Sequence, residues 1–177
     1  GEGFALADLA LTGAQAKLIK AIHATGKPVI LVLVTGKPFS IAWEKKHIPA
    51  ILIQWYAGEQ EGSSIANILF GKTNPSGHLT VSFPQSSGHL PAYYNHLPTD
   101  RGFYHKPGSY EQPGRDYVFS SPGPLWAFGH GLTYTTFNYT DMQIQQSVDS
   151  IKVFVTVKNT GRWAGKAVPQ LYVRDVF

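Results

Sequence analysis

Two continuous apolar runs constrain the fold of this chain more than any other feature of its sequence. Residues 29–34 read VILVLV and residues 50–55 read AILIQW. Short apolar runs of this kind, rich in β-branched side chains, are typical of strands that are covered on both faces, as in a parallel sheet flanked by helices. The sequence therefore predicts a mostly parallel sheet with both faces covered.

Helical patterns surround both runs. Ahead of the first run, Thr12 and Gln15 fit a capping box, apolar residues follow at helical spacing, and Gly26 closes the segment. A short helix is expected within residues 39–46, and a third helix is expected over residues 62–70. The alternation of helix and strand indicates the α/β class.

Residues 84–133 interrupt this alternation, because they are rich in Pro, Gly and aromatic residues and keep no sustained period. Disordered segments are poor in aromatic residues. Long ordered loops in compact domains are usually functional. We therefore expect a packed loop here, in which most of the aromatic side chains fill space between other segments.

The last forty residues have the alternating pattern of antiparallel strands. Strands are expected over residues 151–157 and 168–173. A β-sandwich of the immunoglobulin type needs about seven strands. We therefore expect two regions, an α/β region over residues 1–136 and the opening strands of a sandwich over residues 137–177.

Composition excludes several classes of protein. Hydrophobic residues make up 43% of the chain and charged residues 15%, which places it among folded globular chains. The net charge of +4 comes from scattered residues and not from a basic stripe, so no nucleic-acid partner is expected. No window approaches the ~18 unbroken apolar residues of a membrane helix, so no membrane insertion is expected. The absence of cysteine excludes disulfides and thiolate chemistry.

Two longer motifs resemble the family 3 glycoside hydrolases, in particular their bacterial β-glucosidase branch. Residues 55–79 read WYAGEQEGSSIANILFGKTNPSGHL and resemble the signature of that family's second domain. Residues 128–137 read FGHGLTYTTF and resemble the segment that ends the domain. The resemblance implies that residues 1–136 are the C-terminal part of an α/β sandwich domain and that residues 137–177 begin a fibronectin type III-like domain.

The start of the chain carries a third, shorter resemblance. Gly-Glu-Gly at residues 1–3, followed by Asp8 and the apolar residues 9–11, is similar to the loop on which family members carry their acid/base glutamate. The resemblance implies that Glu2 is this acid/base in a retaining, exo-acting β-glycosidase. It also implies that the nucleophile is an aspartate on an N-terminal (β/α)₈ barrel, which this chain does not contain.

Glycosidic cleavage needs both groups, because one carboxyl protonates the leaving oxygen while the other meets the positive charge at the anomeric carbon. The chain alone is therefore expected to be inactive. Candidate substrate-binding residues are Phe4 beside Glu2, and Arg101 and Tyr104 in the loop region, where an arginine can bond sugar hydroxyls and rings can stack on sugars.

Other assignments remain open. Glu59 and Glu61 lie at the start of the third expected helix, where acidic residues usually interact favourably with the helix dipole. The seven histidines show no pair at metal-ligand spacing on a helix, so neither a metal nor a cofactor is expected. The expected substrate is a β-glucoside or an oligosaccharide. A non-catalytic carbohydrate-binding or structural module is the alternative function, a homodimer is compatible with the sequence, and the resemblance favours a periplasmic or secreted bacterial protein.

Overall fold

The computed structural model describes residues 3–95, 111, 120–121 and 123–173. Contacts divide the chain into two compact units, which are described separately below. The first unit comprises Gly1–Glu59 and Leu79–His130, and the second comprises Gln60–His78 and Gly131–Phe177. Each unit is therefore assembled from two separate stretches of sequence.

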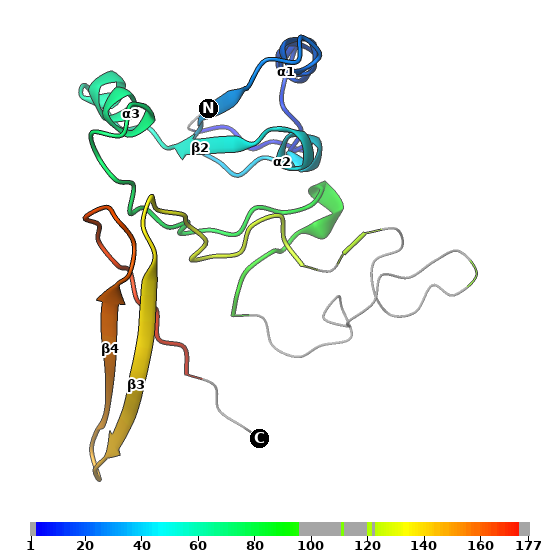
Figure 1. The fold of residues 1–177 in the computed structure, drawn as a ribbon. Helices are drawn as coiled ribbons and strands as arrows, with labels where there is room; N and C mark the ends of the chain where they lie inside the picture. Colours follow the sequence, from blue (N-terminus) through cyan, green and yellow to red (C-terminus); the bar gives the residue numbers. More distant parts are fainter. Residues whose placement is uncertain (1–2, 96–110, 112–119, 122, 174–177) are drawn as a thin grey trace. The chain divides into compact units, whose positions relative to one another are not determined.

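The first unit contains the predicted parallel strands. Strand β1 (Ile30–Val34) pairs in parallel with β2 (Ala50–Gln54), so that Leu33 lies opposite Ile53. Helix α1 (Gln15–His23) precedes β1, and helix α2 (Ala42–His47) connects the two strands (Figure 1). The predictions of these four elements are confirmed, within a few residues at each end.

One face of this small sheet packs on the core of the unit. The side chain of Phe83 has no exposed surface, and Leu33 is buried in the same cluster. The cluster's other buried members are Ile41, Leu79 and Leu125. The aromatic rings of Phe83 and Trp126 meet edge to face, with centroids 5.8 Å apart. This core draws most of its residues from outside regular secondary structure.

Two irregular segments supply that part of the core by pairing with each other. The backbone N–H of Leu79 donates to the His130 carbonyl at 2.8 Å, and the N–H of Phe83 donates to the Trp126 carbonyl at the same distance. A short 3₁₀ helix, η1 (Ser87–His89), follows the first segment. Within residues 84–133, the described residues that take part in this pairing are thus packed, as the sequence predicts, whereas Leu90 and Tyr94 are more than half exposed.

The capping box predicted for α1 is wrong. The helix begins at Gln15 with Ala14 at the N-cap, and no side chain caps it. Gly13 adopts a φ of +60°, a left-handed turn that glycine tolerates, and this turn leaves Thr12 outside the cap position. Only the Thr12 carbonyl reaches the helix, where it accepts from the Gln15 N–H at 3.4 Å.

The prediction that both faces of the sheet are covered is met only in part among the described residues, because Val32 is partly buried while the ends of the same strand are exposed. Ile30 is 55% exposed and Val34 is 48% exposed, and both lie on the face opposite Leu33. The side chains of Leu18 and Ile22 on α1 are exposed as well. Helix α1 instead contacts α2 through His23 and Lys20, which meet the ring of Trp43.

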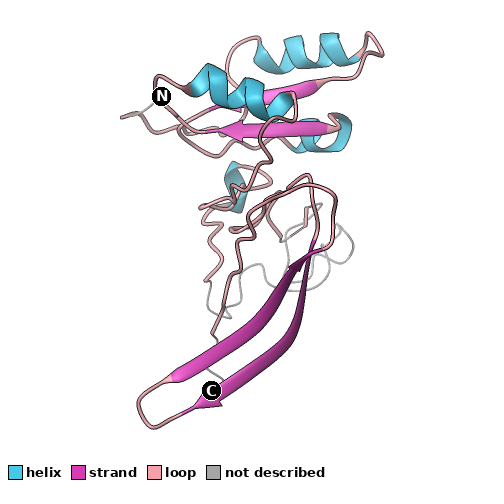
Figure 2. Ribbon diagram, turned by 60° about the vertical axis from the view of Figure 1, so that its left-hand side comes forward, coloured by secondary structure: helices cyan, strands magenta, loops and turns pink. Residues whose placement is uncertain are grey.

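The second unit combines helix α3 (Glu61–Leu69) with an antiparallel hairpin of β3 (Phe137–Gln146) and β4 (Ile151–Asn159) (Figure 2). The sequence predicted the helix and the second strand. The strand predicted over residues 168–173 is wrong, because these residues form no strand. Pro169 lies inside that run and lacks the N–H that a central ladder position needs.

The side-chain amide of Asn74 connects three parts of this second unit. Its Oδ1 accepts from the Thr133 hydroxyl at 2.6 Å and from the Tyr134 N–H at 2.7 Å. Its Nδ2 donates to the Ala164 carbonyl at 2.9 Å. The turn after α3, the segment before β3 and the segment after β4 thus share one amide group.

We expect Asn74→Ala to lower the free energy of unfolding by about 1–2 kcal/mol, because it leaves several partly covered donors and acceptors without their protein partner. Urea unfolding would measure this difference. Asn138→Ala is the matched control, since Asn138 is an exposed asparagine on β3. Equal losses in the two variants would show that Asn74 does not hold the unit together.

Candidate functional site

The described residues include one of the four candidate site residues. Glu2, Arg101 and Tyr104 lie outside the described residues. Phe4 is described, and its ring is 76% exposed. The ring is thus accessible on the surface, as a sugar-stacking residue would need to be.

The segment that follows Glu2 is anchored at Asp8 and Leu9. The Leu9 N–H donates to the Ser87 hydroxyl oxygen at 3.0 Å, and this hydroxyl donates to the Asp8 carboxylate at 3.4 Å. The same carboxylate oxygen accepts from the Ala10 N–H at 3.0 Å. One serine of η1 therefore fixes the chain at a point six residues after Glu2.

Leu9 also makes a second hydrogen bond, through its backbone carbonyl. Leu9 is buried, and its carbonyl accepts from the backbone N–H of Ser40 at 2.8 Å. Ser40 lies two residues before the start of α2. The anchored segment is therefore held both by η1 and by the connection between β1 and α2.

The carboxyl ends of β1 and β2 meet close to one another, as parallel pairing requires. Thr35 follows β1, and its hydroxyl donates to the Lys37 carbonyl at 2.7 Å while accepting from the Lys37 N–H at 3.0 Å. Ligands of open α/β sheets bind outside this end of the strands. Sequence reasoning did not single out these residues, although a Thr-Gly pair directly after an apolar run was a usable signal.

Gly36 leaves space for an aromatic ring at this end of the sheet. A Cβ at Gly36 would lie 2.7 Å from Cε2 of Tyr56, a separation at which something must shift. Tyr56 follows β2, and its side chain is about half exposed. The glycine therefore lets the Tyr56 ring lie against the backbone that leaves β1.

Aromatic side chains of the loop region pack on one another. The rings of Tyr94 and Phe128 stack with centroids 4.4 Å apart. The Lys45 ammonium lies 5.2 Å from the centroid of the Trp126 ring and also donates to the Leu125 carbonyl. Among the described rings of this region, Trp126 and Phe128 thus pack on other side chains, whereas Tyr94 remains about half exposed.

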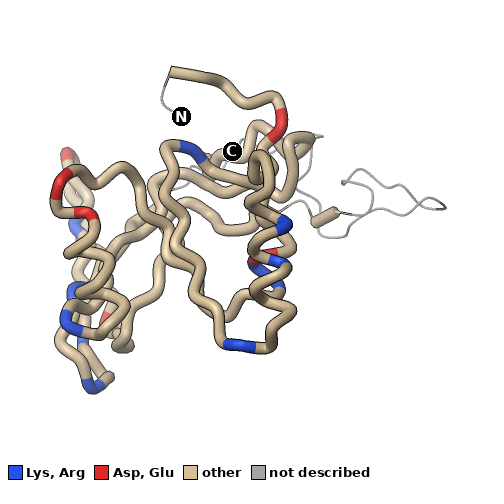
Figure 3. Tube along the Cα trace, turned by 90° about the horizontal axis from the view of Figure 1, so that it is seen from above, with Lys and Arg blue, Asp and Glu red and all other residues tan. Residues whose placement is uncertain are grey.

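The charges of the described residues are dispersed. Lysines and arginines occur singly or in short groups on several elements, and acidic residues lie between them (Figure 3). Glu61 is the first residue of α3, where a carboxylate favours the positive end of the helix dipole. Glu59 lies in the turn before that helix and is exposed. Both placements fit the interpretation that these glutamates interact with the helix dipole and have no catalytic role.

Within the described ranges, no group of three or more His, Cys, Asp or Glu side chains is arranged to hold a metal ion. The same ranges contain no helix of sufficient length and apolarity to cross a membrane.

Comparisons with known proteins identify close relatives. Residues 1–134 match the family described as the glycosyl hydrolase family 3 C-terminal domain. A β-xylosidase of Formosa agariphila is 43% identical over 99% of this chain and 24% of its own length. A periplasmic β-glucosidase of Salmonella typhimurium is 41% identical over 96% of this chain and 22% of its own length.

A solved structure agrees with these matches. The structure of a β-glucosidase from Erythrobacter marinus superposes with a TM-score of 0.77 at 40% identity, covering 93% of this chain and 21% of that protein. This chain therefore spans between a fifth and a quarter of the length of the relatives it matches.

We expect Ser87→Ala to release the anchored segment, because the Leu9 N–H then loses its acceptor and the Asp8 carboxylate loses a donor. Amide exchange at Leu9 should accelerate by about tenfold, the change that a loss of about 1.4 kcal/mol produces. Exchange at Leu33 should stay unchanged. Ser86→Ala is the control in the neighbouring residue, and equal acceleration in both variants would show that the Ser87 hydroxyl is not the anchor.

Proposed function

The chain belongs to glycosyl hydrolase family 3, and on that premise we propose that it is the part of a retaining, exo-acting β-glycosidase that contributes the acid/base glutamate. The observation that carries the proposal is the match of nearly the whole chain to proteins named β-xylosidase and β-glucosidase. The complete protein would release terminal β-linked sugars from oligosaccharides, with β-glucosides as the first substrates to test.

Glu2 is the proposed acid/base. In the first step its carboxyl group protonates the leaving oxygen, and in the second step its carboxylate takes a proton from the water that hydrolyses the glycosyl-enzyme. Such a group must be held within reach of the scissile bond. The anchoring of Asp8 and Leu9 to Ser87 supports this role, because it limits the positions that a glutamate six residues upstream can reach.

The second carboxylate of the mechanism is proposed to come from another domain. A retaining enzyme places its two carboxyl groups about 5–5.5 Å apart. We assign the nucleophile to an aspartate on an N-terminal (β/α)₈ barrel, because the family resemblance implies that arrangement. The chain covers only 22–24% of its curated relatives, which leaves ample length for such a domain.

Within the chain we propose the division into residues 1–136 and residues 137–177. The first part would be the C-terminal part of an α/β sandwich domain, and the second would begin a fibronectin type III-like domain. The hairpin of β3 and β4 supports the second assignment, because one of its faces is apolar and the other is mainly polar. Ile144 and Val153 pair on the apolar face, and Gln145 and Lys152 pair on the polar face. Sheets of a β-sandwich bury one face and expose the other.

Substrate contacts are proposed for Phe4, Arg101 and Tyr104. The exposed ring of Phe4 supports a stacking role, since sugars present apolar faces to aromatic rings. A periplasmic or secreted location is proposed as well, and the relative named periplasmic β-glucosidase supports it.

We expect the purified 177-residue chain to release no nitrophenol from an aryl β-glucoside in the steady state. Its glutamate could contribute general acid catalysis of about 10²–10⁴-fold, but no carboxylate would meet the charge at the anomeric carbon. A continuous absorbance assay measures the release, with the complete protein as the positive control. Steady turnover by the isolated chain would contradict the proposed division of the two carboxylates.

In the complete protein, Glu2→Ala should affect two substrates unequally. Cellobiose has a poor leaving group and should lose about 10²–10⁴-fold in rate, whereas an aryl glycoside with a good leaving group should lose little in the first step. Azide needs no general base, so it should restore turnover of the aryl glycoside by attacking the glycosyl-enzyme.

Asp149→Ala is the control, because it removes an exposed carboxylate of the same chain that is not a candidate acid/base, and it should leave both rates unchanged. If Glu2→Ala slows both substrates equally and azide rescues neither, the acid/base is another residue. Glu59 and Glu61 would then be tested first. A complete protein that hydrolyses neither substrate would favour the non-catalytic module.

A further inference from the structure

The two faces of the β3–β4 hairpin differ in chemistry. The register places Gln143 opposite Phe154, Gln145 opposite Lys152 and Thr140 opposite Thr156. Since paired residues share a face of the sheet, these residues form one polar face that contains a single aromatic ring. The opposite face carries the apolar pairs Tyr139 with Val157 and Ile144 with Val153.

The apolar face is the one that a β-sandwich would bury, so the polar face is the one that would stay in water. Phe154 is nevertheless on the polar face, and its ring is 48% exposed. Exposed apolar surface of this kind is unfavourable in water by roughly 25 cal/mol per Å². A flat ring among polar side chains therefore offers surface that a ligand can cover with a gain in free energy.

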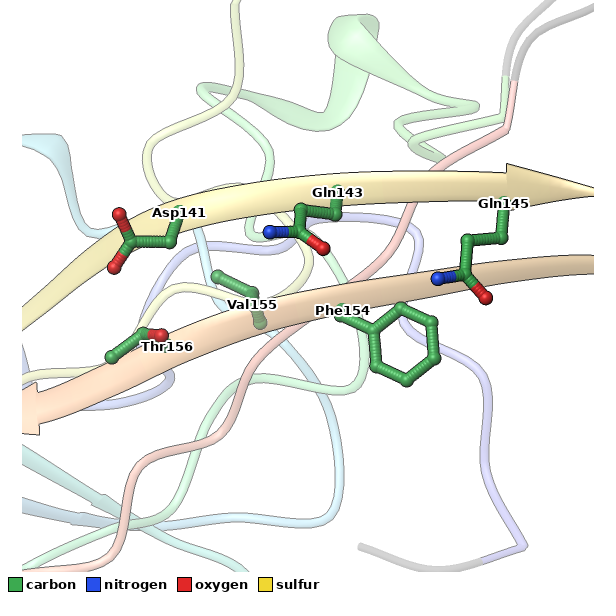
Figure 4. Close-up of a pocket in the computed structure, with 6 residues that line it drawn as sticks. All are labelled: Asp141, Gln143, Gln145, Phe154, Val155 and Thr156. Atoms are coloured by element: carbon green, nitrogen blue, oxygen red, sulfur yellow. The ribbon is translucent and has the colours of Figure 1, made fainter.

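A shallow hollow of about 290 Å³ lies on the hairpin at this ring. Figure 4 shows the side-chain amides of Gln143 and Gln145 together with the Phe154 ring on its lining. The lining residues are Asp141, Gln143, Gln145, Phe154, Val155 and Thr156. The lining thus combines amide, hydroxyl and carboxylate groups with one aromatic ring, and these polar groups can donate to and accept from sugar hydroxyls.

A bulge shapes one end of the hollow. The register shifts between Thr140 and Gln143, so two residues of β3 lie opposite one residue of β4. Asp141 in this bulge has a φ of +55°, a backbone conformation that non-glycine residues rarely adopt and that costs on the order of 1 kcal/mol. Its carboxylate accepts from the Thr140 hydroxyl at 2.8 Å. Bulges of this kind redirect side chains and are frequent beside binding sites.

We propose that this polar face is an ancillary binding surface for a neutral, β-linked oligosaccharide. The apolar C–H face of a sugar ring would cover Phe154, and its hydroxyls would bond the amides of Gln143 and Gln145 and the carboxylate of Asp141. The choice of an oligosaccharide rests on the proposed function, in which the complete protein acts on such chains. None of the residues assigned to catalysis is among the residues that line this hollow.

The experiment is a titration of the ¹⁵N-labelled 177-residue chain with cellohexaose, followed by NMR. The side-chain amide signals of Gln143 and Gln145 should shift with a Kd on the order of 1 mM, as few contacts and a shallow site imply. Nuclear Overhauser effects between protons of β3 and β4, measured on the same sample, report whether the hairpin is formed. A formed hairpin whose amide signals do not move at about 10 mM cellohexaose overturns the proposal.

Three variants separate stacking from folding. Phe154→Leu keeps an apolar side chain but removes the flat ring, and it should weaken binding by about tenfold, which corresponds to about 1.4 kcal/mol. Phe154→Tyr keeps the ring and should bind as the parent chain does. Gln146→Ala removes an amide from the opposite face and should change nothing. Equal affinities of the Leu and Tyr variants would overturn the stacking role of Phe154.

The complete protein provides the second measurement. In a native gel that contains soluble mixed-linkage β-glucan, the Phe154→Leu variant should be retarded less than the Phe154→Tyr variant. Equal retardation of the two variants overturns the proposal even if the isolated chain fails to form the hairpin. Hydrolysis of an aryl β-glucoside should be the same in both variants, so failure of this surface is distinguishable from failure of the proposed catalytic function.

Discussion

Backbone hydrogen bonds between residues 79–83 and residues 125–130 join two irregular segments, and the core of the first unit is built around them. The backbone N–H of Phe83 donates to the Trp126 carbonyl, and the Phe83 carbonyl accepts from the Leu125 N–H. Both backbone polar groups of this fully buried residue therefore have a hydrogen-bond partner. A buried backbone group without a partner costs about 1–3 kcal/mol. This pairing therefore permits two stretches without regular secondary structure to cover one face of the parallel sheet. Ser87, the residue that anchors Leu9, lies four residues after the first of these stretches.

The sequence predicted the elements whose signals are local. The runs of β1 and β2 and the helical spacing of α3 depend on neighbours within a few residues, and each appears close to its expected bounds. Predictions failed where one residue changes the backbone conformation or the pairing. Gly13 turns the chain before α1, and Pro169 removes a donor from the run at residues 168–173. Neither effect is visible when hydrophobicity or strand propensity is averaged over a short segment of sequence.

The candidate site was less predictable than the fold, because its supports join residues that are distant in sequence. Ser87 meets Leu9 across 78 residues, and no spacing rule connects a serine in a Pro- and Gly-rich region with a leucine near the start of the chain. The same holds for Gly36 and Tyr56, which only the parallel pairing brings together. The resemblance to a family suggested Glu2, whereas the contacts that restrain its segment became apparent only from the folded chain.

The hydrogen bond between Leu79 and His130 also bears on how proteins of this kind can diversify. It closes the base of the intervening stretch, so the ends of that stretch stay together whatever its length. For a flexible closed loop, each doubling of length adds only about 0.6 kcal/mol of entropic cost. Insertions and deletions in the part of this stretch that lies between Phe83 and Leu125 should therefore cost little free energy, as long as the two paired segments remain in place.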